Sequence, residues 1–188
     1  MYEFIRIIIQ ILKIDKKFFS NQKNFGEASI YFAILIILIS ALISLIPNTA
    51  FIEYMSLKFS LGKVEGPSLR SVIIISYSMW IIKAAYLYFA GVIMFPNKNT
   101  KCNFRKILIL VGYSHIPMFL NVLTINYSFL FLLIITYIWY NISLIVGLNI
   151  ILNYKNIVKS ILIVNSPFFI LFIYLLSIFS QGQVHTIS

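Results

Sequence analysis

Long, uninterrupted apolar runs are the feature that most constrains what this chain can fold into. Five such runs, separated by short clusters of Lys, Asn and Pro, approach the length of about 20 residues that a helix needs to cross a hydrocarbon layer. The runs are continuously apolar instead of alternating, which argues against a transmembrane β-barrel. With 61% hydrophobic and only 11% charged residues, the chain also has too few polar side chains to cover a water-soluble surface. We therefore expect an all-α integral membrane protein.

The runs divide the chain into five transmembrane helices within one domain, residues 28–179. We place these helices at about residues 28–46, 72–95, 107–123, 128–152 and 161–179. Pro47-Asn48 is expected to end the first helix, and Pro167 to lie in a loosened first turn of the fifth, where proline is tolerated. Residues 180–188 are polar and are expected to form a flexible tail.

The first 27 residues predict an amphipathic helix on the cytoplasmic side. Polar side chains recur there at steps of three and four residues and form one narrow stripe, which consists of Glu3, Arg6, Gln10, Lys13 and Lys17. Such a helix lies in the membrane interface or on the surface of a helical bundle. A cleaved signal peptide is the competing interpretation, but polar residues interrupt the apolar stretch and no small-residue cleavage pattern follows.

The basic residues predict the orientation of the helices. The N-terminal segment and the second and fourth loops together hold eleven Lys and Arg, whereas the first loop, on the opposite side, holds three. By the positive-inside rule the N-terminus is cytoplasmic and the C-terminus non-cytoplasmic, in the plasma membrane of the cell. The net charge of +10 is scattered over short loops, so we interpret it as topology signals and contacts with anionic lipids, with no nucleic-acid partner.

The third apolar run is interrupted by the stretch Val111–Pro117, which contains Gly112, Tyr113 and His115. Proline has no backbone N–H, so Pro117 leaves the carbonyl of Tyr113 without its helical donor. In lipid that carbonyl needs another donor. The sequence therefore predicts a third helix kinked at Pro117 and buried against its neighbours.

Lys83 is the one basic residue predicted to lie at membrane depth, and all five acidic residues fall outside the predicted helices. A charged group at that depth is costly and suggests a function. The candidate polar pocket consists of Lys83, Tyr113, His115 and Asn141. Lys83 is also a candidate donor to the Tyr113 carbonyl. Two purely structural interpretations remain open: Lys83 reaches toward the headgroups, and His115 is a hydrogen-bonded packing residue.

Signatures of catalysis are absent from the sequence. It has no paired carboxylates in an apolar run, no Gly-rich phosphate loop and no Ser-His-Asp or Cys-His pattern. A metal site needs several His, Cys or carboxylate ligands, and the single cysteine, Cys102, is interpreted as an incidental loop thiol. We expect no catalytic residues, no cofactor and no metal.

The stretch Gly112-Tyr113, followed after three residues by Pro117, resembles the Gly-Tyr-x-x-x-Pro signature in the third transmembrane helix of Yip1 domain proteins. Trp139 and Gly147, followed by a short basic loop, are similar to that family's fourth helix. The resemblance implies a compact five-helix membrane domain. In eukaryotic members it also implies binding of Rab-type small GTPases and of sister proteins in vesicle transport.

Two features distinguish this chain from the eukaryotic members. Its cytoplasmic N-terminal segment has only about 27 residues, and the Asp-Leu-Tyr-Gly-Pro motif of their second helix is missing. Both weaken the case for binding a small GTPase, and the chain looks like the shorter prokaryotic branch of the family.

Two functions follow from these observations. The first is a non-enzymatic membrane protein that acts by association with lipids, partner membrane proteins or further copies of itself, in a trafficking-like or membrane-organising role. The alternative is a small transporter or channel with a polar pocket around Lys83 and the kinked third helix.

Overall fold

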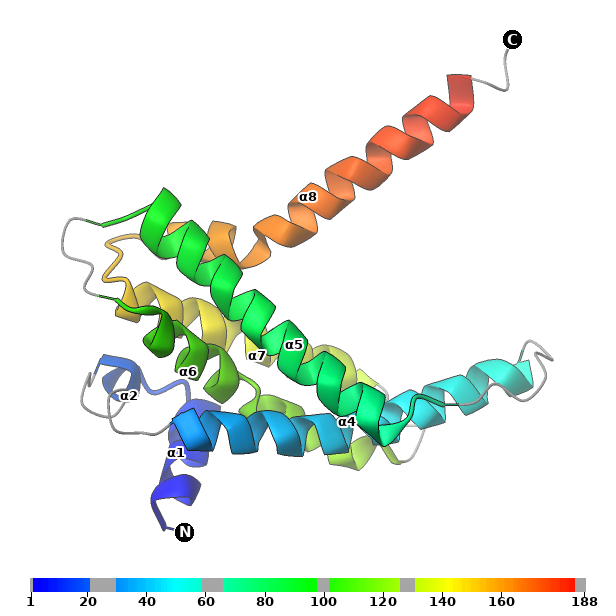
Figure 1. The fold of residues 1–188 in the computed structure, drawn as a ribbon, viewed down its shortest axis with the longest axis horizontal. Coiled ribbons are helices and arrows are strands. Elements are labelled where there is room, and N and C mark those ends of the chain that lie inside the picture. The colour runs from blue at the N-terminus through cyan, green and yellow to red at the C-terminus, as the bar shows by residue number, and fades with distance from the viewer. Residues whose placement is uncertain (1, 21–29, 59–65, 98–101, 126–130, 185–188) are drawn as a thin grey trace.

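The computed structural model describes residues 2–20, 30–58, 66–97, 102–125 and 131–184, and almost all of these residues are helical (Figure 1). This confirms the all-helical class. In chain order the elements are α1 (Tyr2–Leu12), α2 (Lys16–Ser20), α4 (Ile30–Lys58), α5 (Leu69–Tyr88), the π-helix η1 (Phe89–Met94), α6 (Phe104–Ser114), the 3-10 helix η2 (Ile116–Ile125), α7 (Phe131–Ile151) and α8 (Ile157–Val184).

Three stretches of the described residues are long and apolar enough to cross a membrane: Leu69–Met94, Phe104–Thr124 and Phe131–Ile151. Two shorter apolar stretches, Ile30–Leu45 and Ile157–Ile170, lie in α4 and α8. Outward-facing residues of α5 and α7 are large and apolar, including Ile74, Ile82 and Ile134, each more than half exposed. Apolar surface of this extent is typical of a face covered by lipid.

Helix α6 is at the centre of the bundle. Between Ile107 and Ser114 only Leu108 is not fully buried. Asn103 caps the helix, because its side-chain oxygen accepts a hydrogen bond of 3.0 Å from the backbone N–H of Lys106. Trp80 of α5 donates from Nε1 to the carbonyl of Leu108, at 2.8 Å, and so ties the outer helix to the central one. Helix α6 is thus enclosed by the other helices along most of its length.

Helices α4, α5 and α7, and α6 together with η2, run between two ends of the bundle (Figure 1). At one end, on the left of the view, lie α2, η1, the beginning of α6, the end of α7 and the beginning of α8. At the opposite end lie the end of α4 and the beginnings of α5 and α7. Consecutive long helices therefore alternate in direction.

The N-terminal segment differs from the single helix expected over residues 1–27. It contains two helices, α1 and α2, separated by a turn in which Ile14 has a φ of 51°. The N–H groups of Ile14 and Asp15 donate back to Ile11 and Gln10, both at 2.9 Å, which is the hydrogen-bond pattern of a Schellman helix end. Asp15 then caps α2 by accepting from the N–H of Lys17. Residues 21–27 of the expected helix lie outside the described residues.

Three prolines act differently from one another. Pro47 was expected to end the first long helix, but α4 continues to Lys58. The fixed φ of proline is itself helical, and only one backbone donor is lost. Around Pro117 the expected kink is a change of helix type, since α6 ends at Ser114 and η2 begins at Ile116. Pro167 lies ten residues inside α8 and not in its first turn.

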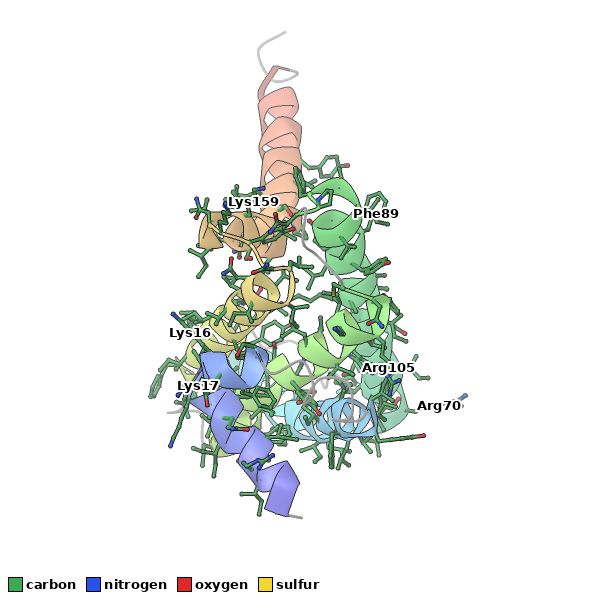
Figure 2. All side chains as sticks on the ribbon, turned by 90° about the vertical axis from the view of Figure 1, so that its left-hand side faces the viewer. Lys16, Lys17, Arg70, Phe89, Arg105 and Lys159 are labelled. Atoms are coloured by element: carbon green, nitrogen blue, oxygen red, sulfur yellow. The ribbon has the colours of Figure 1, made fainter. Side chains whose placement is uncertain are left out.

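The interior position of Pro167 is tolerated because side chains replace the missing backbone donor. Proline removes the hydrogen bond to the carbonyl four residues back, here that of Ile163. That carbonyl accepts from Ser166 Oγ at 2.9 Å and from Tyr86 Oη of α5 at 3.3 Å. Figure 2 shows that the first part of α8, which carries Lys159, crosses the view, whereas its later part points away from the bundle. The helix reaches Val184, so the expected flexible tail is helical over residues 180–184, and 185–188 lie outside the described part.

Candidate functional site

One end of the bundle carries exposed basic side chains from three separate segments. We call it the basic end, and define it by Lys16, Lys17, Arg105, Lys155 and Lys159, all of them exposed. Figure 2 looks onto this end and shows Lys16 and Lys17 of α2, Arg105 of α6 and Lys159 of α8 spread across it. The one acidic residue whose side chain is described, Asp15, caps α2. The basic end therefore presents positive charge that comes from segments distant in sequence.

The N-terminal helices are anchored to the bundle by four apolar side chains. Ile7 and Ile11 of α1 are 6% and 0% exposed, and Phe18 and Phe19 of α2 are each 2% exposed. Arg6, Lys13, Lys16 and Lys17 are all exposed. The amphipathic pattern of the sequence thus has its apolar side packed onto the bundle and its basic side toward the surroundings.

The family-motif residues lie where the helices approach most closely. A Cβ added to Gly112 would come within 2.7 Å of Ala33 Cβ, so the absence of a side chain lets α6 contact α4. A Cβ on Gly147 would meet Leu110 Cδ1 at 2.3 Å and the Phe19 ring at 3.0 Å. Small residues that permit such approach are typical of helix contacts in membranes.

The aromatic and proline residues of the motif have different surroundings. Tyr113 is fully buried, and its ring stacks on Phe18 with a centroid distance of 6.2 Å. Pro117 is buried in η2, while Trp139 of α7 is half-buried. Two motif residues, Tyr113 and Gly147, therefore lie against the phenylalanines of α2.

Lys83 and Asn141 line one groove between α5, α7 and α8, with a volume of about 620 Å³. The Lys83 amine lies over the ring of Tyr140, 4.3 Å from its centroid. Asn141 donates from Nδ2 to the carbonyl of Tyr137 at 2.9 Å. Tyr86 and Asn165, which the sequence did not single out, line the same groove.

His115 lines a second, smaller hollow of about 230 Å³ between α4, α5 and η2. Its Nδ1 lies 2.8 Å from the carbonyl of Val111, one turn earlier in its own chain. The His115 ring also contacts Tyr140, with centroids 4.7 Å apart. Tyr140 therefore contacts both His115 and Lys83, and the fully buried Tyr113 lines neither of these two hollows.

Neither a metal centre nor a reactive thiol is formed by the described residues. Among them no three His, Cys, Asp or Glu side chains gather into a possible metal site. Burial raises the pKa of the Cys102 thiol to about 11, although the nearby Lys106 ammonium acts in the opposite direction. A thiol with so high a pKa is a poor nucleophile at neutral pH.

Comparison with known proteins gives one match. The family model described as the Yip1 domain matches residues 9–179, a range that includes α2, the central helix and both motif glycines. No curated protein and no solved structure matches the chain.

Proposed function

The chain belongs to the Yip1 domain family of membrane proteins, and we propose that it acts by association, with its basic end holding anionic lipids or partner proteins at the cytoplasmic membrane surface. Members of this family are generally non-enzymatic. The observation that carries the proposal is the convergence of exposed Lys and Arg from α2, α6 and α8 on one end of the bundle.

The proposed topology has five crossings. It counts α4 and α8 together with the three long apolar stretches, and puts the basic end in the cytoplasm. The alternating direction of the helices supports this count, because an odd number of crossings leaves the two termini of the bundle on opposite sides. In this arrangement the basic end lies at the level of the anionic headgroups of the cytoplasmic leaflet.

The strength of the attraction sets the scale of the test. A basic residue near an anionic surface contributes about 1 kcal/mol, so removing two charges weakens binding of an anionic lipid by roughly 30-fold. The experiment compares Lys16→Gln/Lys17→Gln with the wild type and with Arg70→Gln. Arg70 is exposed at the beginning of α5, at the opposite end of the bundle, and is the matched control.

Binding is measured as phosphatidylglycerol retained per protein by native mass spectrometry, against phosphatidylcholine. We expect the double variant to lose its preference for phosphatidylglycerol and Arg70→Gln to keep it. Chemical cross-linking in cells tests the partner-protein arm with the same variants. Retention of lipid preference and of every cross-link in the double variant would refute the proposal. These charge variants are sharper than deletion of the N-terminal helices, which would also remove the buried Phe18 and Phe19.

A small transporter or channel is the second candidate, and the groove beside Lys83 is the observation that favours it. In this alternative the Lys83 side chain contacts the transported solute as it passes between α5, α7 and α8. Lys83→Met then abolishes solute flux in proteoliposomes, and unchanged flux would argue against transport through this groove.

A further inference from the structure

The groove between α5, α7 and α8 has apolar walls and a single cationic side chain. Met79 and Ile82 of α5 and Phe168 and Ile170 of α8 line it, and all four are more than half exposed. Lys83 is half-buried on the wall beside α7. A volume of about 620 Å³ falls within the range of about 300–1,000 Å³ that is usual for small-molecule sites.

The Lys83 ammonium has no carboxylate beside it in the described part of the chain. The one described acidic side chain, Asp15, is used to cap α2, and the contact of Lys83 is with the face of the Tyr140 ring. A cation over an aromatic face is partly stabilised, yet its charge is not neutralised. An ammonium at membrane depth is costly, and such residues usually pair with an opposite charge.

Two further hydrogen-bond donors, Asn141 and Asn165, line the same groove. The Nδ2 atoms of Asn141 and Asn165 each donate to a carbonyl of their own helix, those of Tyr137 and Ile161. An amide nitrogen carries two hydrogens, so each has a second N–H for a ligand in the groove. One cation and two amide donors match a small, singly charged acceptor such as a carboxylate.

The depth of the groove selects among anionic amphiphiles. Lys83 lies roughly 15–20 Å along the helix from either end of the stretch Leu69–Met94. A phospholipid phosphate stays at the headgroup level, about 15 Å from the centre of the bilayer. A single-chain carboxylate has a smaller head that can move deeper, while its chain lies along the apolar walls.

We propose that this groove binds a long-chain fatty acid, with its carboxylate on Lys83 and its chain between α5 and α8. None of the lining residues is one of the five that define the basic end. The site is therefore separate from the basic end, and each can be tested without the other.

The test uses hexadecanoic acid that carries a photoreactive diazirine in its chain, with the purified full-length protein in phosphatidylcholine nanodiscs. We expect cross-links on groove peptides of α5, α7 or α8. Unlabelled hexadecanoate should compete at least tenfold better than hexadecanol, which has the same chain without the charge. Equal competition by hexadecanol, or better competition by phosphatidylglycerol, would overturn the assignment.

Variants separate the role of the charge from that of the groove. Lys83→Met should reduce labelling at least tenfold, Lys83→Arg should retain it, and Arg70→Met, at an exposed position outside the basic end, should leave it unchanged. Ile82→Trp fills the groove while keeping Lys83, and it should also abolish labelling. It provides a second test if Lys83→Met does not yield monodisperse protein. Wild-type labelling in both Lys83→Met and Ile82→Trp would rule out the site.

Discussion

Substitution of Gly112 by Ala should loosen the contact between the central helix and α4. The new Cβ would lie 2.7 Å from Ala33 Cβ and 3.2 Å from Ala33 Cα, whereas carbon atoms pack best at about 3.5–4.0 Å. Ala33 has no side-chain torsion that could move its methyl group aside. One of the two helices must therefore shift.

Two opposing effects determine the magnitude. Overpacking a well-filled core costs about 1–3 kcal/mol, while Ala in place of Gly inside a helix gains about 1 kcal/mol. We expect a net loss of roughly 0–2 kcal/mol in the free energy of unfolding, which is too small to interpret alone. A double-mutant cycle with Ala33→Gly isolates the clash, because this second change removes the methyl group that the new one meets.

The cycle is measured by titration with sodium dodecyl sulfate in mixed micelles, followed by circular dichroism. We expect a favourable coupling of at least about 1 kcal/mol between Gly112→Ala and Ala33→Gly. Gly91→Ala is the control. Its new Cβ would meet Leu152 Cδ1 at 2.6 Å, but that atom is the end of a flexible side chain and can move aside. Additivity within about 0.5 kcal/mol would show that the approach of α4 and α6 is looser than described.

Three further predictions concern other contacts. Gly147→Ala should displace Phe19 and release α2, so that trypsin cleaves after Lys17 faster than in the wild type. An unchanged cleavage rate would contradict the packing of Phe19 against Gly147. Tyr154→Phe removes the hydroxyl that contacts the carbonyls of Gly91 and Phe95, at 2.7 and 2.9 Å, and should destabilise the fold by about 1–3 kcal/mol in thermal unfolding; Tyr31→Phe, at a residue 76% exposed, should cost almost nothing, and equal effects would refute the reasoning. Because the pKa of Cys102 is raised to about 11, its alkylation by N-ethylmaleimide should be slow at pH 7 and rise about tenfold per pH unit up to that pKa; mass spectrometry showing a plateau near pH 9 would be inconsistent with the buried thiol.

The sequence predicted those features that depend on local backbone chemistry. The break of the third helix follows from Gly112 and Pro117, and the structure changes helix type within that stretch. The alternation of long apolar runs with basic loops is likewise visible in the sequence, because burial in lipid requires apolar side chains on every face.

Features that depend on how helices meet were not predictable in the same way. Pro167 lies inside α8 because Tyr86 and Ser166 provide donors to the carbonyl of Ile163, and the sequence does not reveal which tyrosine of another helix reaches that carbonyl. The contact between Lys83 and Tyr140 depends on which face of α7 meets α5. The turn at Ile14 was hard to predict, because a β-branched residue rarely has a positive φ. The following Asp15 is only a weak signal for a turn.

The sidedness of the basic end tests the central claim most directly, because association with the cytoplasmic membrane surface depends on it. In a Cys102→Ser background, Lys16→Cys and Arg70→Cys each introduce one exposed thiol at opposite ends of the bundle. A membrane-impermeant maleimide should label Lys16→Cys in inverted vesicles but not in spheroplasts, and Arg70→Cys in spheroplasts but not in inverted vesicles. Labelling of both positions from the same side, or of Lys16→Cys from outside the cell, would contradict the proposed topology and with it the role of the basic end.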